Sequence, residues 1–163
     1  MEMRDVQLVG LISDTHGLLR DEAIQALRGV DLILHAGDVG KPEILETLKT
    51  LAPVVAVRGN IDTAPWAKGL PATAVVEARL ASFYILHNVQ DLDLNPKVAG
   101  FHCVVSGHSH QSGSIERDGV LYINPGSAGP RRFKLPISLA RLDLGNTPWK
   151  VKFIDLEKPY AED

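Results

Sequence analysis

The chain has 163 residues, of which 45% are hydrophobic and 23% are charged, and its formal net charge at pH 7 is −3. This length and apolar content predict one folded domain over residues 1–163 and exclude a disordered chain. The negative charge argues against a general binder of nucleic acids or membrane surfaces, which would carry an excess of basic residues.

The sequence also predicts where the protein works. No segment approaches the ~20 consecutive apolar residues that span a bilayer, and the N-terminus lacks the pattern of a signal peptide. Cys103 is the one cysteine, so no internal disulfide can form. We therefore expect a cytoplasmic protein without membrane association, and we interpret Cys103 as a buried strand residue.

The first sixty residues alternate between strand-like and helical patterns. Short apolar runs predict buried strands at residues 6–13, 30–38 and 53–60. Helical spacing of apolar residues predicts helices at residues 21–29 and 41–52. This β-α-β-α-β order predicts a parallel sheet with right-handed crossovers.

The second half of the chain is dominated by strand patterns. Residues 94–101 predict at best a short helix, and residues 112–127 predict a hairpin that turns at residues 117–119. The other predicted strands lie at residues 73–80, 81–88, 103–110, 137–144 and 149–157. The last two alternate apolar and polar residues, as half-buried antiparallel strands do.

Side chains capable of chemistry occur where the apolar strands end. In chain order they are Asp14, His16, Asp38, Asn60, His87, His108 and His110. Ligands of open α/β sheets bind outside the carboxyl ends of the strands, so we expect these side chains to share one cleft. His108 and His110 are two positions apart, and in an extended segment both would point to the same face.

This set of side chains suits metal ions. Mixed nitrogen and oxygen ligands favour manganese, iron, zinc, cobalt or nickel over calcium and magnesium. Seven ligands exceed what one tetrahedral ion needs, so they indicate two ions that share a carboxylate, an arrangement used to cleave phosphate esters. A purely structural site is disfavoured, because such sites are usually closed, tetrahedral and rich in cysteine.

Each of these residues also has a structural interpretation when it is considered alone. Asp14 can cap the N-terminus of a following helix, and Asp38 and Asn60 each follow a glycine, as loop residues often do. His35 is interpreted as a residue that is packed or that supports the ligands from outside, and His102 as a structural residue. The joint arrangement favours chemistry, because one loop residue does not predict the next.

The blocks containing these residues resemble those of a known family. They are SDTHG (13–17), GDVG (37–40), RGNID (58–62), LHN (86–88), SGHSH (106–110) and NPGS (124–127). In order and spacing they resemble the calcineurin-like metallophosphoesterases, most closely the small single-domain phosphodiesterase branch, over about residues 6–130. The resemblance implies an α/β fold, a four-layer α/β-β/α sandwich of two mixed sheets.

The resemblance also implies roles for the ligand residues. Asp14, His16 and His110 would hold one metal together with Asp38, and Asn60, His87 and His108 would hold the second. Asp38 would bridge the two ions, with Asp38 and Asn60 as catalytic residues. The reaction would be in-line attack of a metal-bridging hydroxide on the phosphorus of a small substrate, and the branch implies a diester in preference to a monoester. Manganese is the first expectation for both ions, with nickel, cobalt, iron or zinc as alternatives.

Two departures from the family pattern bear on the substrate. Ile61 stands where many larger members have a histidine that assists the leaving group, whereas Asp62 matches the small branch. We hypothesise from Ile61 a preference for good leaving groups. The second departure is His87-Asn88-Val89, where the branch usually has His-Gly-His.

The segment 124–132 resembles the family's closing loop. Asp62, Asn124, Ser127 and Arg131 are therefore candidates for contacting the substrate or supporting the ligands. Arg131 or Arg132 would bind a phosphate. A turn with a solvated arginine pair is the alternative.

A second class of function stays open. A scaffold subunit of retromer has the same fold but binds proteins through an altered metal site. All seven ligand positions are filled here by ligand-competent residues, which favours the enzyme. Strands at residues 73–88 or 137–157 would allow copies of the chain to pair as a homo-oligomer.

Overall fold

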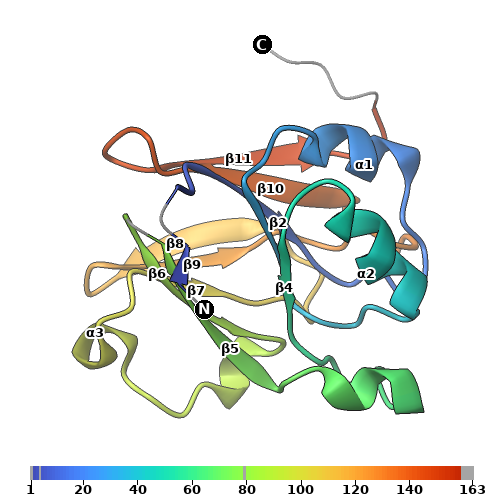
Figure 1. The fold of residues 1–163 in the computed structure, drawn as a ribbon, viewed down its shortest axis with the longest axis horizontal. Helices are drawn as coiled ribbons and strands as arrows, with labels where there is room; N and C mark the ends of the chain where they lie inside the picture. The colour runs from blue at the N-terminus through green and yellow to red at the C-terminus, as the bar shows by residue number, and fades with distance from the viewer. Residues whose placement is uncertain (1, 4, 79, 159–163) are drawn as a thin grey trace.

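The computed structural model describes residues 2–3, 5–78 and 80–158. Two mixed β-sheets pack face to face, with helices over one outer face (Figure 1). The five-stranded sheet has the order β11-β10-β2-β3-β4, with the strands β2 (Leu8–Ile12), β3 (Leu32–His35), β4 (Val54–Ala56), β10 (Ser138–Asp143) and β11 (Lys150–Asp155). Strands β2, β3 and β4 are parallel, as the β-α-β-α-β pattern predicts, and β10 and β11 add antiparallel pairs.

The second sheet has six strands in the order β1-β5-β6-β7-β9-β8. Its strands are β1 (Glu2–Met3), β5 (Thr73–Ala78), β6 (Ser82–Leu86), β7 (Cys103–Val105), β8 (Gly113–Arg117) and β9 (Val120–Asn124). The helices are α1 (Asp21–Leu27), α2 (Pro42–Lys49), α3 (Pro96–Ala99) and the 3-10 turns η1 (Pro65–Gly69) and η2 (Val89–Asp91).

Apolar side chains hold the layers together. Between the sheets, Leu11 and Leu34 of one sheet and Phe83 of the other are fully buried in one cluster. Helices α1 and α2 cover the outer face of the five-stranded sheet, where they pack on residues such as Ile12 and Ile33. The four-layer prediction is confirmed.

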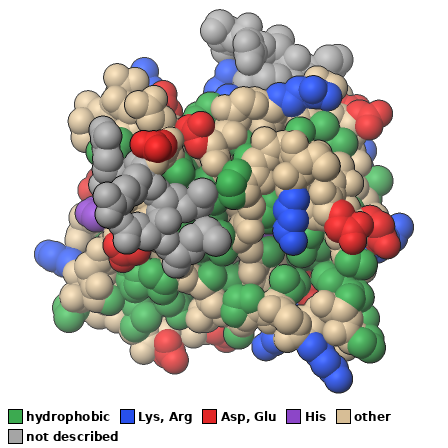
Figure 2. Space-filling model, viewed as in Figure 1, with side chains coloured by type: hydrophobic (Ala, Val, Ile, Leu, Met, Phe, Trp, Pro, Cys, Tyr) green, Lys and Arg blue, Asp and Glu red, His purple; other side chains and the backbone are tan. Residues whose placement is uncertain are grey.

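The fourth layer is thin. The segment at residues 92–101, which contains α3, packs over Tyr84 and Val104 on the outer face of the six-stranded sheet. On the face shown in Figure 2, acidic and basic side chains are interspersed, without a large area of one sign. None of the helices in the described part of the chain is long and apolar enough to cross a membrane.

The structure corrects several predicted boundaries. The strand expected at 103–110 ends at Val105, the helix expected at 41–52 ends at Lys49, and the strand expected at 53–60 is only β4. Both strands end before the polar loop residues that follow them. The hairpin prediction is confirmed, because Arg117 pairs with Val120 across the turn.

Candidate metal centre

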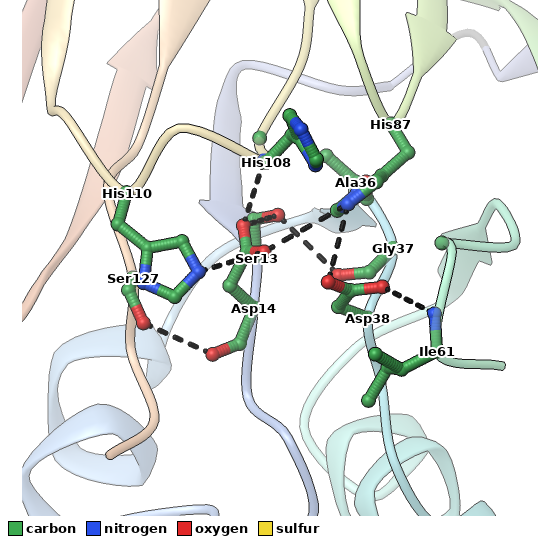
Figure 3. A network of polar contacts seen from close by, with 12 residues as sticks. Ser13, Asp14, Ala36, Gly37, Asp38, Ile61, His87, His108, His110 and Ser127 are labelled. Carbon is green, nitrogen blue, oxygen red and sulfur yellow. Dashed lines mark hydrogen bonds and ion pairs between the residues drawn. The ribbon is translucent and has the colours of Figure 1, made fainter. Parts of the chain in front are cut away.

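Two buried aspartates lie at the centre of the site, and each uses one carboxylate oxygen for hydrogen bonds (Figure 3). Oδ2 of Asp14 accepts from the Ser13 hydroxyl at 2.6 Å and from the backbone N–H of His108 at 3.1 Å. Oδ1 of Asp38 accepts from the backbone N–H of Ile61 at 3.1 Å. These bonds fix both carboxylates and leave Asp14 Oδ1 and Asp38 Oδ2 to face the imidazoles.

Three imidazoles converge on those two oxygens. Nε2 of His110 lies 3.3 Å from Oδ1 of Asp14, and Nε2 of His87 lies 3.2 Å from Oδ2 of Asp38. Nε2 of His16 lies 3.5 Å from Asp38 Oδ2 and 3.8 Å from Asp14 Oδ1. Two groups of candidate metal ligands result, one of Asp14, His16 and His110 and one of Asp14, Asp38 and His87.

The buried polar atoms of these residues fit a metal centre. Asp14 Oδ1, the Nε2 atoms of His16 and His87, and both ring nitrogens of His110 have no hydrogen-bond partner among the described residues. Buried polar groups nearly always have a partner, so five such atoms in one place need an explanation. Oxygen and imidazole donors are the ligands that divalent transition metals prefer, and a metal would satisfy them.

A hydrogen bond at Nδ1 of His87 orients the ring so that Nε2 can bind a metal. Its Nδ1 lies 2.7 Å from the carbonyl oxygen of Ala36 and donates to it. This bond leaves Nε2 directed at the carboxylates (Figure 3). A backbone carbonyl behind a ligating histidine fixes the ring and its tautomer in the same way in known metal sites.

The carboxylates and imidazoles shift one another's pKa. Burial opposes ionisation of Asp14, but His110, His16 and Ser13 outweigh it and hold the pKa of Asp14 well below its usual range. For Asp38 burial is likewise outweighed, by His87 and the Ile61 N–H, and its pKa is lowered.

The two histidines that face both carboxylates respond in the opposite sense. The pKa of His16 is raised, chiefly by Asp14. Burial would lower the pKa of His87, but Asp38, the Ala36 carbonyl and Asp14 together outweigh burial and raise it. Metal binding requires the deprotonated ring nitrogen, so a bound metal would compete with protons at both imidazoles.

The backbone at the site is unusual. Left-handed φ angles, rare for residues other than glycine, occur at Asp14 (56°), His16 (47°), Asp38 (57°), His108 (71°) and His110 (62°). Such conformations cluster at functional sites, where the surrounding structure enforces them. Five of the seven predicted ligand positions share this feature, which the sequence patterns do not reveal.

Two glycines allow the loops to approach closely. A Cβ atom on Gly59 would lie 2.8 Å from Cγ of Asp38, and one on Gly107 would lie 2.5 Å from Oδ2 of Asp14. Any side chain there would displace a carboxylate. The glycines of the RGNID and SGHSH blocks are therefore required by packing.

Asn60 and His108 are placed differently from the other predicted ligands. Both side chains are exposed, and with His87 they line a cavity of about 430 Å³. His108 belongs to neither candidate ligand group, although its ring centre lies 5.2 Å from that of His87. The structure thus brings both residues to the edge of the site.

The geometric argument for the two neighbouring histidines is wrong. His108 and His110 lie in a loop with left-handed backbone, not in an extended segment. Their rings diverge, because His110 lies near His16, 5.5 Å between ring centres, whereas His108 lies near His87. The two histidines therefore serve opposite sides of the aspartate pair.

Asp62 binds the backbone of two loops that carry candidate ligands. Its buried carboxylate accepts hydrogen bonds from the backbone N–H groups of Val39 at 3.1 Å, Gly40 at 3.0 Å and Gly59 at 2.9 Å. It thereby ties the loop that follows Asp38 to the loop that carries Asn60.

Asn124 and Ser127 also bind the backbone of ligand loops. The Asn124 amide donates to the carbonyl of Gly107 at 3.0 Å and to the Ser109 hydroxyl at 3.1 Å. The Ser127 hydroxyl donates to the backbone carbonyl of Asp14 at 3.1 Å. Both side chains therefore hold loops that carry candidate ligands.

Arg131 forms an ion pair with Glu157. Together with Arg132, Pro130, His16 and His110 it lines a second cavity of about 180 Å³. The predicted phosphate contact thus has two candidate arginines, of which Arg131 already has a partner.

His35 is packed and supports the loops of two candidate ligands, as its interpretation predicts. It is fully buried, and burial lowers its pKa to about 4, so the ring is neutral. Its Nδ1 accepts from the Gly37 N–H at 3.1 Å, and its Nε2 lies 3.0 Å from the Thr15 hydroxyl, which donates to Val39. The ring therefore joins the loops of Asp14 and Asp38. Its position three residues before Asp38 was the available signal.

Asp14, Cys103 and His102 each had a structural interpretation, and the structure decides among them. Asp14 is not a helix cap, because α1 begins at Asp21. Cys103 is buried, which raises the pKa of its thiol to about 12, so it is no nucleophile. His102 accepts a hydrogen bond from the Ser82 N–H, as a structural residue would. Ser13, which orients Asp14, is a site residue that the pattern analysis missed.

Comparison with known proteins identifies the family of the chain. Residues 8–147 match the profile of the calcineurin-like phosphoesterase superfamily domain. The chain is 34% identical over 149 residues to a probable metallophosphoesterase of Methanothermobacter thermautotrophicus, with 83% of this chain and 86% of the relative covered. The chain therefore belongs to the calcineurin-like phosphoesterase superfamily, in its small single-domain branch.

Solved structures show the same fold. The structure of an archaeal phosphodiesterase matches with a TM-score of 0.75 and 25% sequence identity. The match covers 90% of this chain and 99% of the phosphodiesterase chain. Vps29 from Chaetomium thermophilum matches with a TM-score of 0.73 and 18% sequence identity. The match covers 91% of this chain and 97% of the Vps29 chain. The second likeness concerns the fold alone.

Proposed function

We propose that this chain is a metal-dependent phosphodiesterase that acts as one domain on small phosphate esters. The observation that carries the proposal is the set of five buried, unpartnered ligand atoms beside two open cavities. A closed structural site would have no need of cavities next to its ligands.

In this proposal Asp14, His16, His110 and Asp38 hold one divalent ion, and Asp38, Asn60, His87 and His108 hold the other. Manganese is the first expectation for both. When bound, such ions neutralise charge on the phosphate and lower the pKa of a coordinated water. Asp38 lies between His16 and His87, which suits it to the bridging role.

The chain's own residues would orient the ester for in-line displacement. The aspartates are held by the N–H groups of His108 and Ile61, so their free oxygens need no reorganisation when ligands arrive. Asn60 and His108 reach the larger cavity, where they would contact the phosphate group. Ile61 carries no proton that could be passed to the leaving group.

The shape of the site supports a diester. One cavity lies at the His87–His108 end of the ligand cluster and the other at the His16–His110 end. A diester carries two substituents, and each cavity could receive one of them. The likeness to an archaeal phosphodiesterase points in the same direction.

The test is hydrolysis by metal-stripped protein to which manganese, nickel, cobalt, zinc or magnesium is returned. Bis(p-nitrophenyl) phosphate reports diesterase activity, and p-nitrophenyl phosphate reports monoesterase activity. Asp38→Asn should reduce manganese-dependent turnover by more than about 100-fold. Loss of a residue that only hydrogen-bonds to a metal ligand costs at most about 100-fold, and Asp38 is proposed as a ligand itself. His108→Ala should also reduce turnover.

Asp118→Asn is the matched control, since Asp118 also has a left-handed backbone (φ 52°) but lies in the hairpin turn. It should leave turnover unchanged. Absence of turnover with every metal, in protein shown to be folded, would contradict the proposal. It would favour a protein-binding scaffold on the same fold.

A further inference from the structure

We infer that Arg132 and Phe133 form a subsite for a planar aromatic group attached to the phosphate, for which a nucleoside is the biological class. The inference rests on the proposed phosphoesterase function, because the subsite adjoins the His16–His110 end of the ligand cluster. It adds a substrate class that the ligand residues do not specify.

Phe133 occupies the tip of a reverse turn in a strained conformation. The N–H of Leu135 donates to the carbonyl of Arg132 at 3.2 Å, which closes the turn around Phe133 and Lys134. The φ angle of Phe133 is 55°. For a bulky side chain this backbone conformation is an outlier, and a glycine would adopt it without strain.

The side chain of Phe133 is also left in water. Its exposed fraction is 85%, the highest value among the exposed large hydrophobic residues of the described chain. Packing therefore explains neither the residue type nor the strained backbone. A strained, exposed aromatic residue that directly follows an arginine of the cavity beside His16 and His110 indicates a binding role.

The two preceding arginines have different roles. Arg131 is anchored, because it pairs with Glu157 and donates to the Leu135 carbonyl at 3.5 Å, across the base of the turn. The guanidinium of Arg132 forms no hydrogen bond or ion pair with any described residue, yet Arg132 lines the cavity beside His16 and His110.

This arrangement matches the chemistry of a nucleotide. A free guanidinium binds phosphate oxygens by charge-assisted hydrogen bonds. An exposed phenyl ring offers a face on which a base can stack, whatever the base. An ester with a small alkyl group would use Arg132 but would gain nothing from Phe133.

The test measures binding of two reaction products to the manganese-loaded protein by isothermal titration calorimetry. Thymidine 5′-monophosphate carries an aromatic base, and methyl phosphate carries none. Phe133→Ala should weaken binding of the nucleotide by about five- to 150-fold, the range for losing one base–aromatic stack. The affinity for methyl phosphate should stay unchanged. Phe133→Tyr, which keeps a ring, should preserve nucleotide affinity.

Controls come from the opposite edge of the molecule. Val98 is 83% exposed in α3, which precedes β7, whereas the ligand loop follows that strand. Val98→Ala should change neither affinity. Arg132→Gln should weaken binding of both ligands to the same extent, because both carry the phosphate group. Arg28→Gln, at a position before β3, should weaken binding of neither.

The outcomes separate the two proposals. Equal affinity of wild type for both ligands, or equal effects of Phe133→Ala on both, would overturn the aromatic subsite alone. Failure of both ligands to bind metal-loaded wild type would contradict the proposed function and this inference with it. Thermal unfolding of each variant verifies that it is folded.

Discussion

The backbone N–H of His108 donates a hydrogen bond of 3.1 Å to Oδ2 of Asp14, although the two residues are 94 positions apart in the sequence. The bond joins the loop after β7 of one sheet to the loop after β2 of the other. It also decides which oxygen of Asp14 is free, because Oδ2 is occupied and Oδ1 is not. One long-range contact therefore holds the sheets together at the site and orients a ligand.

Gly107 makes this contact possible, and we predict that Gly107→Ala disrupts it. The added Cβ would lie 2.5 Å from Asp14 Oδ2, so the carboxylate or the histidine loop must move. We expect manganese affinity to fall by at least about tenfold, as when a partner of a metal ligand is lost. Calorimetric titration with manganese measures the change.

Gly113→Ala is the control for this prediction, since nothing lies within 4 Å of a Cβ at Gly113. It should bind manganese like the wild type. Unchanged affinity in Gly107→Ala would show that the loop yields without moving Asp14.

Asp62→Ala should destabilise the fold. Three backbone N–H groups would lose a buried carboxylate acceptor, and two of them, those of Val39 and Gly59, belong to buried residues. We expect the free energy of unfolding to fall by about 3–5 kcal/mol. Urea titration followed by circular dichroism measures it. Asp93→Ala, at an exposed aspartate, should change it little, and an equal effect at both positions would contradict the role of Asp62.

The buried ring of His35 predicts a pH dependence of stability. Its pKa is about 4 in the folded protein, against an ordinary value of 6.5. Between these values the unfolded chain binds a proton that the folded chain does not. The contribution of His35 is therefore complete above pH 6.5 and declines as the pH falls towards 4, by about 3 kcal/mol in all.

The comparison that isolates this effect is wild type against His35→Gln, both metal-free, with the free energy of unfolding measured at pH 7 and pH 4.5. Contributions from the other histidines cancel in the difference. The variant should lose less stability on acidification than the wild type. Parallel pH profiles would mean that His35 is protonated equally in both states.

Ile61→His should add the missing proton donor. The Ile61 N–H binds Asp38, and its side chain is 42% exposed beside Asn60. An imidazole there should raise kcat for a diester with an alkyl leaving group by at least about tenfold, as general acids do. The effect should be absent for p-nitrophenolate, which leaves without help.

Ile61→Gln controls for polarity at this position and should give no gain. An identical rate in Ile61→His and Ile61→Gln would show that leaving-group protonation does not limit the reaction.

Much of the fold could be predicted from the sequence because its signals are local. The apolar runs before Asp14 and Asp38 are long enough to identify buried strands, and the helices between them require parallel neighbours. The errors lie at element ends, as at Val105, where strand geometry gives way to the loop. There a tertiary contact, such as that of His108 with Asp14, overrides the local preference for extended backbone.

The candidate ligands were also accessible from the sequence, because metal chemistry limits the residue types and the strand ends limit where they can meet. The supporting residues were less accessible. A linear pattern leaves open whether Asp62 and Asn124 contact the substrate or support the ligands, and the structure shows that both bind the backbone of ligand loops. His35 has no chemical signature beyond its position in a strand.

The linear chain was enough to predict the main strands and helices in order, the family and the set of ligand-competent side chains. Hydrophobic periodicity and residue chemistry are properties of a linear chain. Contacts in the folded protein were needed to establish which oxygen of Asp14 is free, that His108 and His110 diverge, and that the guanidinium of Arg131 is paired whereas that of Arg132 is not. These features depend on left-handed turns and on contacts between loops distant in the sequence, which no local pattern encodes.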